Sequence, residues 1–152
     1  MKTAHDPRHI RRIRAVKALF SNTFHPEQEP KSKLAKKVIS QQQEIDDVIV
    51  KCAPEWPLSQ INRLDLSVLR LAVFEMLNKQ STPPKVIIDE AIEIGKRYGS
   101  QSSGGFINGV LASALKATKR DKDIDTDEEQ TAAKNKKMAA KNQQSKKTDD
   151  QQ

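Results

Sequence analysis

The sequence predicts an all-α protein, a compact helical bundle of about five helices over residues 7–118. Two observations within residues 63–115 lead to this fold class. Apolar side chains recur there at steps of three or four residues, which is the repeat of one helix face. The pattern stops at Pro83-Pro84 and again at Gly99, and these residues suit the start and the end of a helix. Three helices in succession therefore form the predicted core.

The first of these helices is expected to begin at Asn62 or Asp65 and to lie at the centre of the bundle. It is apolar over most of its surface, at Leu64, Leu66, Val68, Leu69, Ala72, Val73, Met76 and Leu77. Arg70 interrupts this surface, and an unpaired buried guanidinium is costly. We therefore expect an internal ion pair, for which the nearby sequence offers the carboxylates of Glu75, Asp89, Glu90 and Glu93.

The other two core helices follow Pro84 and Ser102. The apolar positions of the first are Val86, Ile87, Ala91, Ile92, Ile94 and Tyr98. Gly99 is expected to close that helix in the left-handed conformation. Ser102 is a candidate N-cap for the last helix. The inward positions of the last helix are Phe106, Ile107, Val110, Leu111, Ala114 and Leu115.

Another helix begins near the start of the chain, where Asp6 and Pro7 suit an N-cap and a first helical residue. We expect it to run to about Asn22. Its apolar stripe consists of Ile10, Ile13, Val16, Leu19, Phe20 and Phe24. Residues 21–30 are polar, contain two prolines and are expected to form a loop.

A single helix is expected from Ser32 through Ala53, where Pro54 stops it. Trp56 follows in a turn, as the one tryptophan of the chain. We expect its indole to fill a place in the core, in preference to serving as a platform for a nucleic-acid base.

Composition limits the class of protein. The 152 residues allow one domain, and 27 Lys and Arg against 20 Asp and Glu give a net charge of +7, which favours a polyanionic partner. The single cysteine excludes an internal disulfide and suits a reducing compartment. The sequence has no apolar run long enough to span a membrane and no signal peptide pattern, so a cytoplasmic protein is expected.

Two parts of the chain differ in composition. Residues 1–118 form the predicted helical domain, and residues 119–152 form a polar, charged tail. The tail is acidic over Asp121–Glu129, basic over Lys134–Lys147 and almost free of large apolar side chains. Such a segment cannot bury enough apolar area to offset its ordering entropy, so the sequence predicts disorder.

Cations crowd the first three turns of the first helix, at Arg8, Arg11, Arg12, Arg14 and Lys17, with His9 among them. At about 100° per residue they cannot all share one face, although Arg8, Arg11 and Arg12 can. Such a cluster can neutralise phosphates, in which case binding weakens steeply with salt. The alternative is a solvated face that binds nothing.

A second candidate binding segment is glycine-rich, from Ser102 to Gly109. Gly104 and Gly105 weaken a first helical turn, because glycine costs about 1 kcal/mol relative to alanine in a helix interior and less near an end. This cost indicates close approach of backbone or ligand, and free N–H groups at a helix start suit phosphate. A loose helix start without a partner is the alternative. Phe106 suits either stacking on an unpaired base or a place in the core.

The sequence contains no catalytic constellation: it has no P-loop, no dinucleotide-binding glycine pattern and no nucleophile elbow. His5, His9, His25 and Cys52 also lack the spacing of metal ligands. We therefore expect a protein that is not an enzyme and that needs neither metal nor cofactor.

Four segments, in this order, resemble the NusB family. They are A-V-K-A-L-F at 15–20, L-D-x-x-x-L-R-L-A-x-x-E-M-L at 64–77, P-P-K-V-x-I-D-E-A-I-E-I-x-K-R-Y-G at 83–99 and S-x-x-F-I-N-G-V-L at 103–111. Members of that family are all-helical transcription antitermination factors. They bind a short single-stranded RNA element, boxA, together with NusE, a small-subunit ribosomal protein. The resemblance implies that this chain acts in a transcription elongation complex on ribosomal RNA operons.

Carried over residue by residue, the resemblance implies an RNA surface made of Arg8, His9, Arg11, Arg12, Ser103, Gly104, Gly105, Phe106 and Asn108. It implies a NusE surface that includes Phe20, Phe24 and Asp65. The chain departs from the family twice. The helix that usually lies between the first two is missing, and Gly105 stands where members often carry a lysine, which removes one phosphate contact.

Two other functions stay open from the sequence alone. One is a protein-interaction module without specific RNA binding, in which the basic helix only aids solubility. The other is a helix-turn-helix-like binder of duplex DNA at residues 84–98 and 102–118. The second of these helices carries no base-reading pattern beyond Asn108, which argues against DNA. The sequence does not decide between a monomer and a homodimer.

Overall fold

The structure, a computed structural model, describes residues 6–122. These residues contain six α-helices, one short 3-10 helix and no strand, which confirms the all-α class. The helices are α1 (Pro7–Phe24), α2 (Lys33–Ser40), α3 (Gln42–Cys52), α4 (Arg63–Asn78), α5 (Pro84–Tyr98) and α6 (Ser103–Ala117), with the 3-10 helix at Leu58–Gln60. None of the helices in this part of the chain is long and apolar enough to cross a membrane. The predicted tail lies outside the described residues from position 123 onward.

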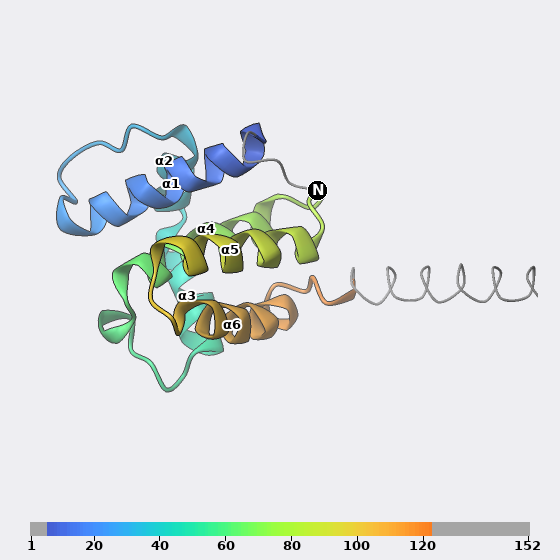
Figure 1. Ribbon diagram of the computed structural model, residues 1–152. Coiled ribbons are helices and arrows are strands. Elements are labelled where there is room, and N and C mark those ends of the chain that lie inside the picture. The colour runs from blue at the N-terminus through green and yellow to red at the C-terminus, as the bar shows by residue number, and fades with distance from the viewer. Residues whose placement is uncertain (1–5, 123–152) are drawn as a thin grey trace, which may run out of the picture. The chain divides into compact units, whose positions relative to one another are not determined.

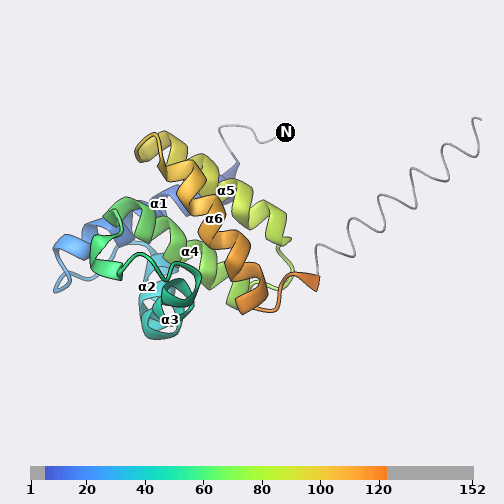
Figure 2. The same cartoon turned by 90° about the horizontal axis from the view of Figure 1, so that it is seen from below.

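Helix α4 lies at the centre of the bundle. It packs against each of the other five helices, and Figures 1 and 2 show α1 on one side of it and α6 on the other. Asn62 caps α4, since its Oδ1 accepts the N–H of Leu64 at 2.9 Å. From Asp65 to Met76 every residue is buried except Arg70, so the apolar pattern of the sequence did mark the core.

Arg70 does form an internal ion pair, but its partner is none of the carboxylates that the sequence suggested. Its guanidinium donates to both oxygens of Asp46 on α3, from Nε at 2.9 Å and from Nη2 at 3.0 Å. This two-pronged geometry satisfies the half-buried cation and fixes α3 against α4.

The helix expected from Ser32 to Ala53 is two helices, so the bundle has six helices where the sequence predicted about five. Ser32 does cap α2, accepting the N–H of Ala35 at 3.1 Å, but the helix breaks at Gln41. The side-chain amides of Gln41 and Asn78, at the end of α4, donate to each other at 3.3 and 2.8 Å. This tertiary contact holds the break, and residues 25–32 before α2 contain no helix.

The turn between α5 and α6 is tight for a reason other than the one expected. Gly99 is extended (φ −98°, ψ −157°) and does not adopt the left-handed conformation. A Cβ at this position would lie 2.6 Å from the carbonyl oxygen of Gly95 and would collide with Oγ of Ser103, so only glycine fits. Ser102 occupies the N-cap position without a capping bond, and Ser103 Oγ instead accepts the N–H of Ser100 at 2.9 Å.

The compact helical unit extends to Arg120, two residues past the boundary at 118 that composition suggested. Lys119 has a left-handed φ of 59°, and the N–H of Arg120 bonds the carbonyl of Leu115 at 2.8 Å, which is a Schellman end for α6. The buried guanidinium of Arg120 then donates to the carbonyls of Met76 at 2.9 Å and Thr82 at 2.7 Å. It thereby satisfies carbonyl groups at the end of α4 and in the α4–α5 turn.

Candidate functional site

The first half of α1 presents unneutralised positive charge. Asp6 caps the helix by accepting the N–H of Arg8 at 2.9 Å, and Pro7 occupies the first turn. The side chains of Arg8, Arg11 and Arg14 are exposed. No carboxylate among residues 6–122 forms an ion pair with any of these three arginines. This end of α1 is therefore free to meet an anionic ligand.

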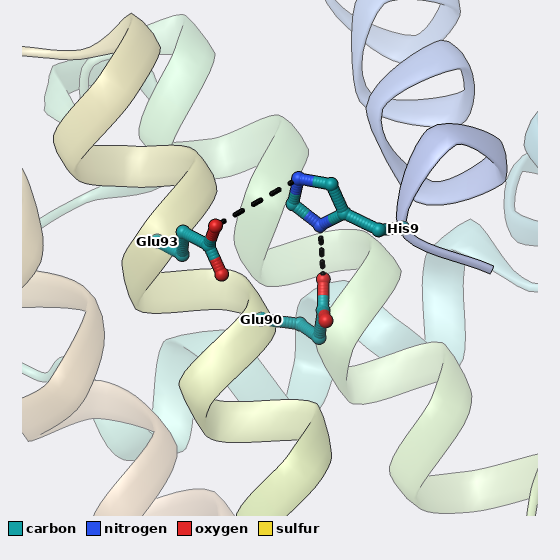
Figure 3. Close-up of side chains that lie close together, drawn as sticks. All are labelled: His9, Glu90 and Glu93. Atoms are coloured by element: carbon teal, nitrogen blue, oxygen red, sulfur yellow. Dashed lines mark hydrogen bonds and ion pairs between the residues drawn. The ribbon is translucent and has the colours of Figure 1, made fainter. Parts of the chain in front are cut away.

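His9 and Arg12, which the resemblance placed on the RNA surface, are buried in a polar network instead. The Nε of Arg12 donates to both carboxylate oxygens of Glu75 at 3.1 Å, and its Nη2 lies 3.0 Å from Glu75 Oε1. Figure 3 shows the His9 ring directed at α5, with Nδ1 2.7 Å from Glu90 Oε2 and Nε2 3.8 Å from Glu93 Oε1. These two side chains hold α1 against α4 and α5.

His9, Glu90 and Glu93 also have ligand atoms within 4.8 Å of one another, a cluster that the sequence spacing did not indicate. Two features make it an ion network. The His9 ring already uses Nδ1 for its bond to Glu90, and Nη1 of Arg12 lies 4.0 Å from the other oxygen of Glu90. Arg12 is paired mainly with Glu75, and together with His9 it places Glu90 in a buried polar network that joins α1 to α5.

The glycine-rich start of α6 is partly exposed. Ser103 and Gly104 are buried, whereas Gly105 and Asn108 are exposed and Phe106 is half-buried. Gly105 has open space where a Cβ would be, so only Gly104 is in close packing. A Cβ at Gly104 would lie 3.0 Å from Cγ and Cε of Lys96, which means that the Lys96 stem crosses the first turn of α6. A cation from α5 therefore lies near this helix N-terminus.

Trp56, which we expected in the core, is 49% exposed. Its ring packs edge-on against Phe106, with centroids 6.2 Å apart and planes at 76°. The two aromatic rings border an open groove of about 300 Å³ between the end of α3 and the exposed glycines of α6. The lining residues are Cys52, Ala53, Pro54, Glu55, Trp56, Gly105, Phe106, Gly109 and Val110.

The other end of α1 exposes an aromatic pair. Phe20 is 37% and Phe24 51% exposed, and their rings pack edge-on with centroids 5.1 Å apart. The Arg63 guanidinium lies 4.3 Å from the Phe24 ring centre, at the start of α4. Next to this pair is a groove of about 420 Å³ lined by Ile13, Val16, Lys17, Phe20, Asn62, Leu64, Ile94, Tyr98 and Gly99.

Asp65, the third residue of the implied partner surface, is 5% exposed and belongs to the interior. Burial raises the pKa of its carboxyl group, and a hydrogen bond from Ser103 opposes that rise. Its Oδ1 has no hydrogen-bond partner within the described residues. Asp65 therefore connects α4 to the start of α6 and does not present a surface to a partner.

The residues expected at one RNA surface lie in two places. His9, which follows Arg8 on α1, meets Glu90 in the middle of α5, whereas Ser103 follows the end of α5 at Gly99. Glu90 and Gly99 are nine residues apart, which is about 14 Å along a helix.

The fold and these surfaces define a class of protein: an all-α bundle whose candidate sites are cationic and aromatic surfaces. The NusB family model matches residues 15–116. The chain belongs to the NusB family.

Individual comparisons agree with this assignment. Proteins named transcription antitermination protein NusB are 46% identical over 78 residues in Desulfosudis oleivorans and 43% identical over 83 residues in Acetivibrio thermocellus. These matches cover 51% and 55% of this chain and 51% and 57% of those proteins, so the chain spans about half the length of the curated relatives it matches. The structure titled T. maritima NusB is similar with a TM-score of 0.68 at 34% identity, over 76% of this chain and 93% of that one.

Proposed function

We propose that this protein is a transcription antitermination factor that binds a boxA-type single-stranded RNA jointly with a NusE-type ribosomal protein. In this role it supports transcription of ribosomal RNA operons as part of the elongation complex. The role consists of binding and positioning, and it requires no chemical step. Its family relatives carry the antitermination name, and the surfaces of this chain support the two binding activities.

The observation that carries RNA binding is the exposed set of Arg8, Arg11 and Arg14 on α1, none of which forms an ion pair within residues 6–122. Each phosphate contact to a single strand contributes about 0.7 to the slope of log affinity against log salt, so three contacts predict a slope near −2. His9 and Arg12 act indirectly in this proposal, because they fix the helix that carries the three arginines.

The α6 surface provides a second contact. Phe106 and the exposed Trp56 offer ring faces and edges on which an unpaired base can stack. Lys96 crosses Gly104 and supplies a cation close to the position where other family members often carry a lysine. Ser103 and Gly104 are buried, so in this proposal they shape the turn, and Gly105, Phe106 and Asn108 meet the RNA.

The partner surface in this proposal is the aromatic pair and the groove beside it. Phe20 and Phe24 expose apolar area next to the hollow that Tyr98 and Leu64 line, and exposed aromatic side chains are typical anchors of protein interfaces. Asp65 is too deeply buried for direct contact.

Competition binding tests the RNA part of the proposal. A labelled boxA RNA would be titrated with the protein against unlabelled scrambled RNA and duplex DNA, at two salt concentrations. We expect preference for boxA, a loss of affinity in Arg8→Ala/Arg11→Ala, and a slope reduced by about 1.4. Lys36→Gln/Lys37→Gln on α2 removes the same charge elsewhere and serves as the matched control. Equal binding to all three nucleic acids would mean that the protein binds polyanions without specificity, and would contradict the proposed boxA binding.

The alternative of a protein-interaction module rests on the same exposed Phe20 and Phe24. It predicts NusE binding that is lost in Phe20→Ala/Phe24→Ala and is unaffected by RNA. The duplex DNA alternative has less support, because the exposed residues of α6 before Lys116 (Gly105, Asn108, Gly109, Ala112 and Ser113) include no cation.

A further inference from the structure

A groove between α1 and α2 is lined by cations from both helices and from the loop between them. Its volume is about 850 Å³, and half of its ten lining residues are cations. The lining consists of Pro7, Ile10, Arg11, Arg14, Lys17, Ala18, Lys31, Ser32, Lys33 and Leu34. The resemblance pointed to Arg11 alone among these residues.

The described part of the chain contains no ion pair that balances the charge of this groove. Within residues 6–122 no carboxylate forms an ion pair with Arg14, Lys31 or Lys33. The neighbouring Lys36 contrasts with them, because its Nζ lies 2.8 Å from Glu29. Like charges that line one groove repel each other, and an anionic ligand relieves that repulsion.

The groove also receives the positive end of α2. Ser32 caps this helix, and Lys31 and Lys33 flank the cap, so the helix N-terminus and two ammonium groups are in the same wall. A helix N-terminus attracts negative charge, and phosphate oxygens suit its free N–H groups. The floor is aliphatic at Ile10, Ala18 and Leu34 and contains no aromatic ring, so it suits the sugar-phosphate backbone better than stacked bases.

We propose that the α1–α2 groove holds the sugar-phosphate backbone of the single-stranded RNA where the strand continues beyond the α1 arginines. This inference rests on the proposed RNA-binding function and extends its surface. Arg11 and Arg14 belong both to the exposed arginines of α1 and to the groove, so the two surfaces are continuous. A polyanion with a charge on every nucleotide matches a groove lined by Arg11, Arg14, Lys31 and Lys33, with Lys17 at its edge, where the Lys17 ammonium lies 5.2 Å from the Tyr98 ring centre.

The test compares two charge-matched variants on two RNAs. Lys31→Gln/Lys33→Gln removes two groove cations, and Lys36→Gln/Lys37→Gln removes two exposed cations of α2 that do not line the groove. The RNAs are a minimal boxA strand and the same strand extended by several nucleotides at both ends. Circular dichroism of each full-length variant establishes that it is folded.

For the extended RNA, we expect the groove variant to lower the salt slope by about 1.4 and the affinity by about 25-fold at 0.1 M salt, since two phosphate contacts are lost. The minimal RNA and the control variant should change little. Equal effects of both variants would mean that only net charge matters, and would overturn the groove assignment. A groove variant that binds the extended RNA as tightly as wild type would overturn it as well.

Failure of the groove and failure of the proposed function give different results. If only the groove is wrong, Arg8→Ala/Arg11→Ala still loses affinity while Lys31→Gln/Lys33→Gln does not. If the proposed function is wrong, neither RNA is preferred over scrambled sequence in wild type. An acidic peptide that contains aliphatic residues is included as a competitor. If the Lys31→Gln/Lys33→Gln substitution weakens binding of this peptide but leaves RNA binding unchanged, the groove belongs to a protein partner and the proposal is overturned.

Discussion

Replacing Arg12 by alanine tests whether this cation stabilises the fold or binds a ligand. Arg12 is 7% exposed and makes a two-pronged bond to Glu75, whose side chain is also buried. Removal of the guanidinium leaves Glu75 as a buried carboxylate without its cation. Breaking a buried ion pair from one side costs about 3–5 kcal/mol, a large part of the 5–15 kcal/mol that stabilises a typical domain.

Urea unfolding followed by circular dichroism measures this cost. We expect Arg12→Ala to lower the free energy of unfolding by about 3–5 kcal/mol. Arg8→Ala is the matched control, since it removes an exposed arginine from the same helix and should cost less than about 0.5 kcal/mol. The double variant Arg12→Met/Glu75→Leu should recover much of the loss, because apolar residues of similar volume can replace a buried pair.

Two results would refute this reasoning. Arg12→Ala and Arg8→Ala could prove equally stable, which would mean that Arg12 is not buried against Glu75 in solution. Arg12→Ala could also keep its stability and lose all RNA affinity, which would return Arg12 to the RNA surface.

Three further predictions concern stability. Because burial raises the pKa of Asp65, the folded state holds its proton more tightly, so this group favours folding at acidic pH and that contribution fades as pH rises through the raised pKa. Asp65→Asn should flatten this part of the pH profile of unfolding and should not destabilise the protein at neutral pH. Lys119→Gly should raise the free energy of unfolding by about 0.5–1 kcal/mol in urea titrations, because glycine adopts a left-handed φ without strain. Gly99→Ala should lower it by about 1–3 kcal/mol, since the added Cβ meets the Gly95 carbonyl and Ser103; a neutral result would show that the turn can open.

Local sequence signals predicted the helix starts well. Asp6 and Pro7, Ser32 and Asn62 lie at helix starts because their side chains or ring act on backbone groups only a few residues away. The apolar period of residues 63–77 marked the central helix because the side chains that it contains are buried in the core. The break at Gln41 has no such local signal, because its amide pairs with Asn78, which is 37 residues away.

The candidate site was predictable only in part, since burial depends on partners distant in the sequence. His9 and Arg12 belong to the same cationic run as Arg8 and Arg11, but they meet Glu90 and Glu75, which lie 81 and 63 residues further along the chain. The helical repeat does place His9 and Arg12 on the same face as the buried Val16 and Leu19, but it does not show which carboxylates they meet.

Other residues were misplaced for the same reason. Trp56 was expected in the core because it is large and apolar, yet it lies exposed beside Phe106 on a distant helix. Lys31 and Lys33 had a usable signal, the basic residues that flank the Ser32 cap, but their alignment with α1 becomes evident only in the folded chain.

The most direct test of the central claim measures the affinity for labelled boxA RNA with and without NusE, in wild type and in Arg8→Ala/Arg11→Ala. If RNA and NusE bind this protein jointly as proposed, NusE should raise its affinity for boxA RNA more than its affinity for scrambled RNA. The boxA RNA should then raise the affinity for NusE by the same factor. The Arg8→Ala/Arg11→Ala variant should lose affinity for RNA and keep its affinity for NusE. RNA affinity that is independent of NusE, sequence and both arginines would contradict the account.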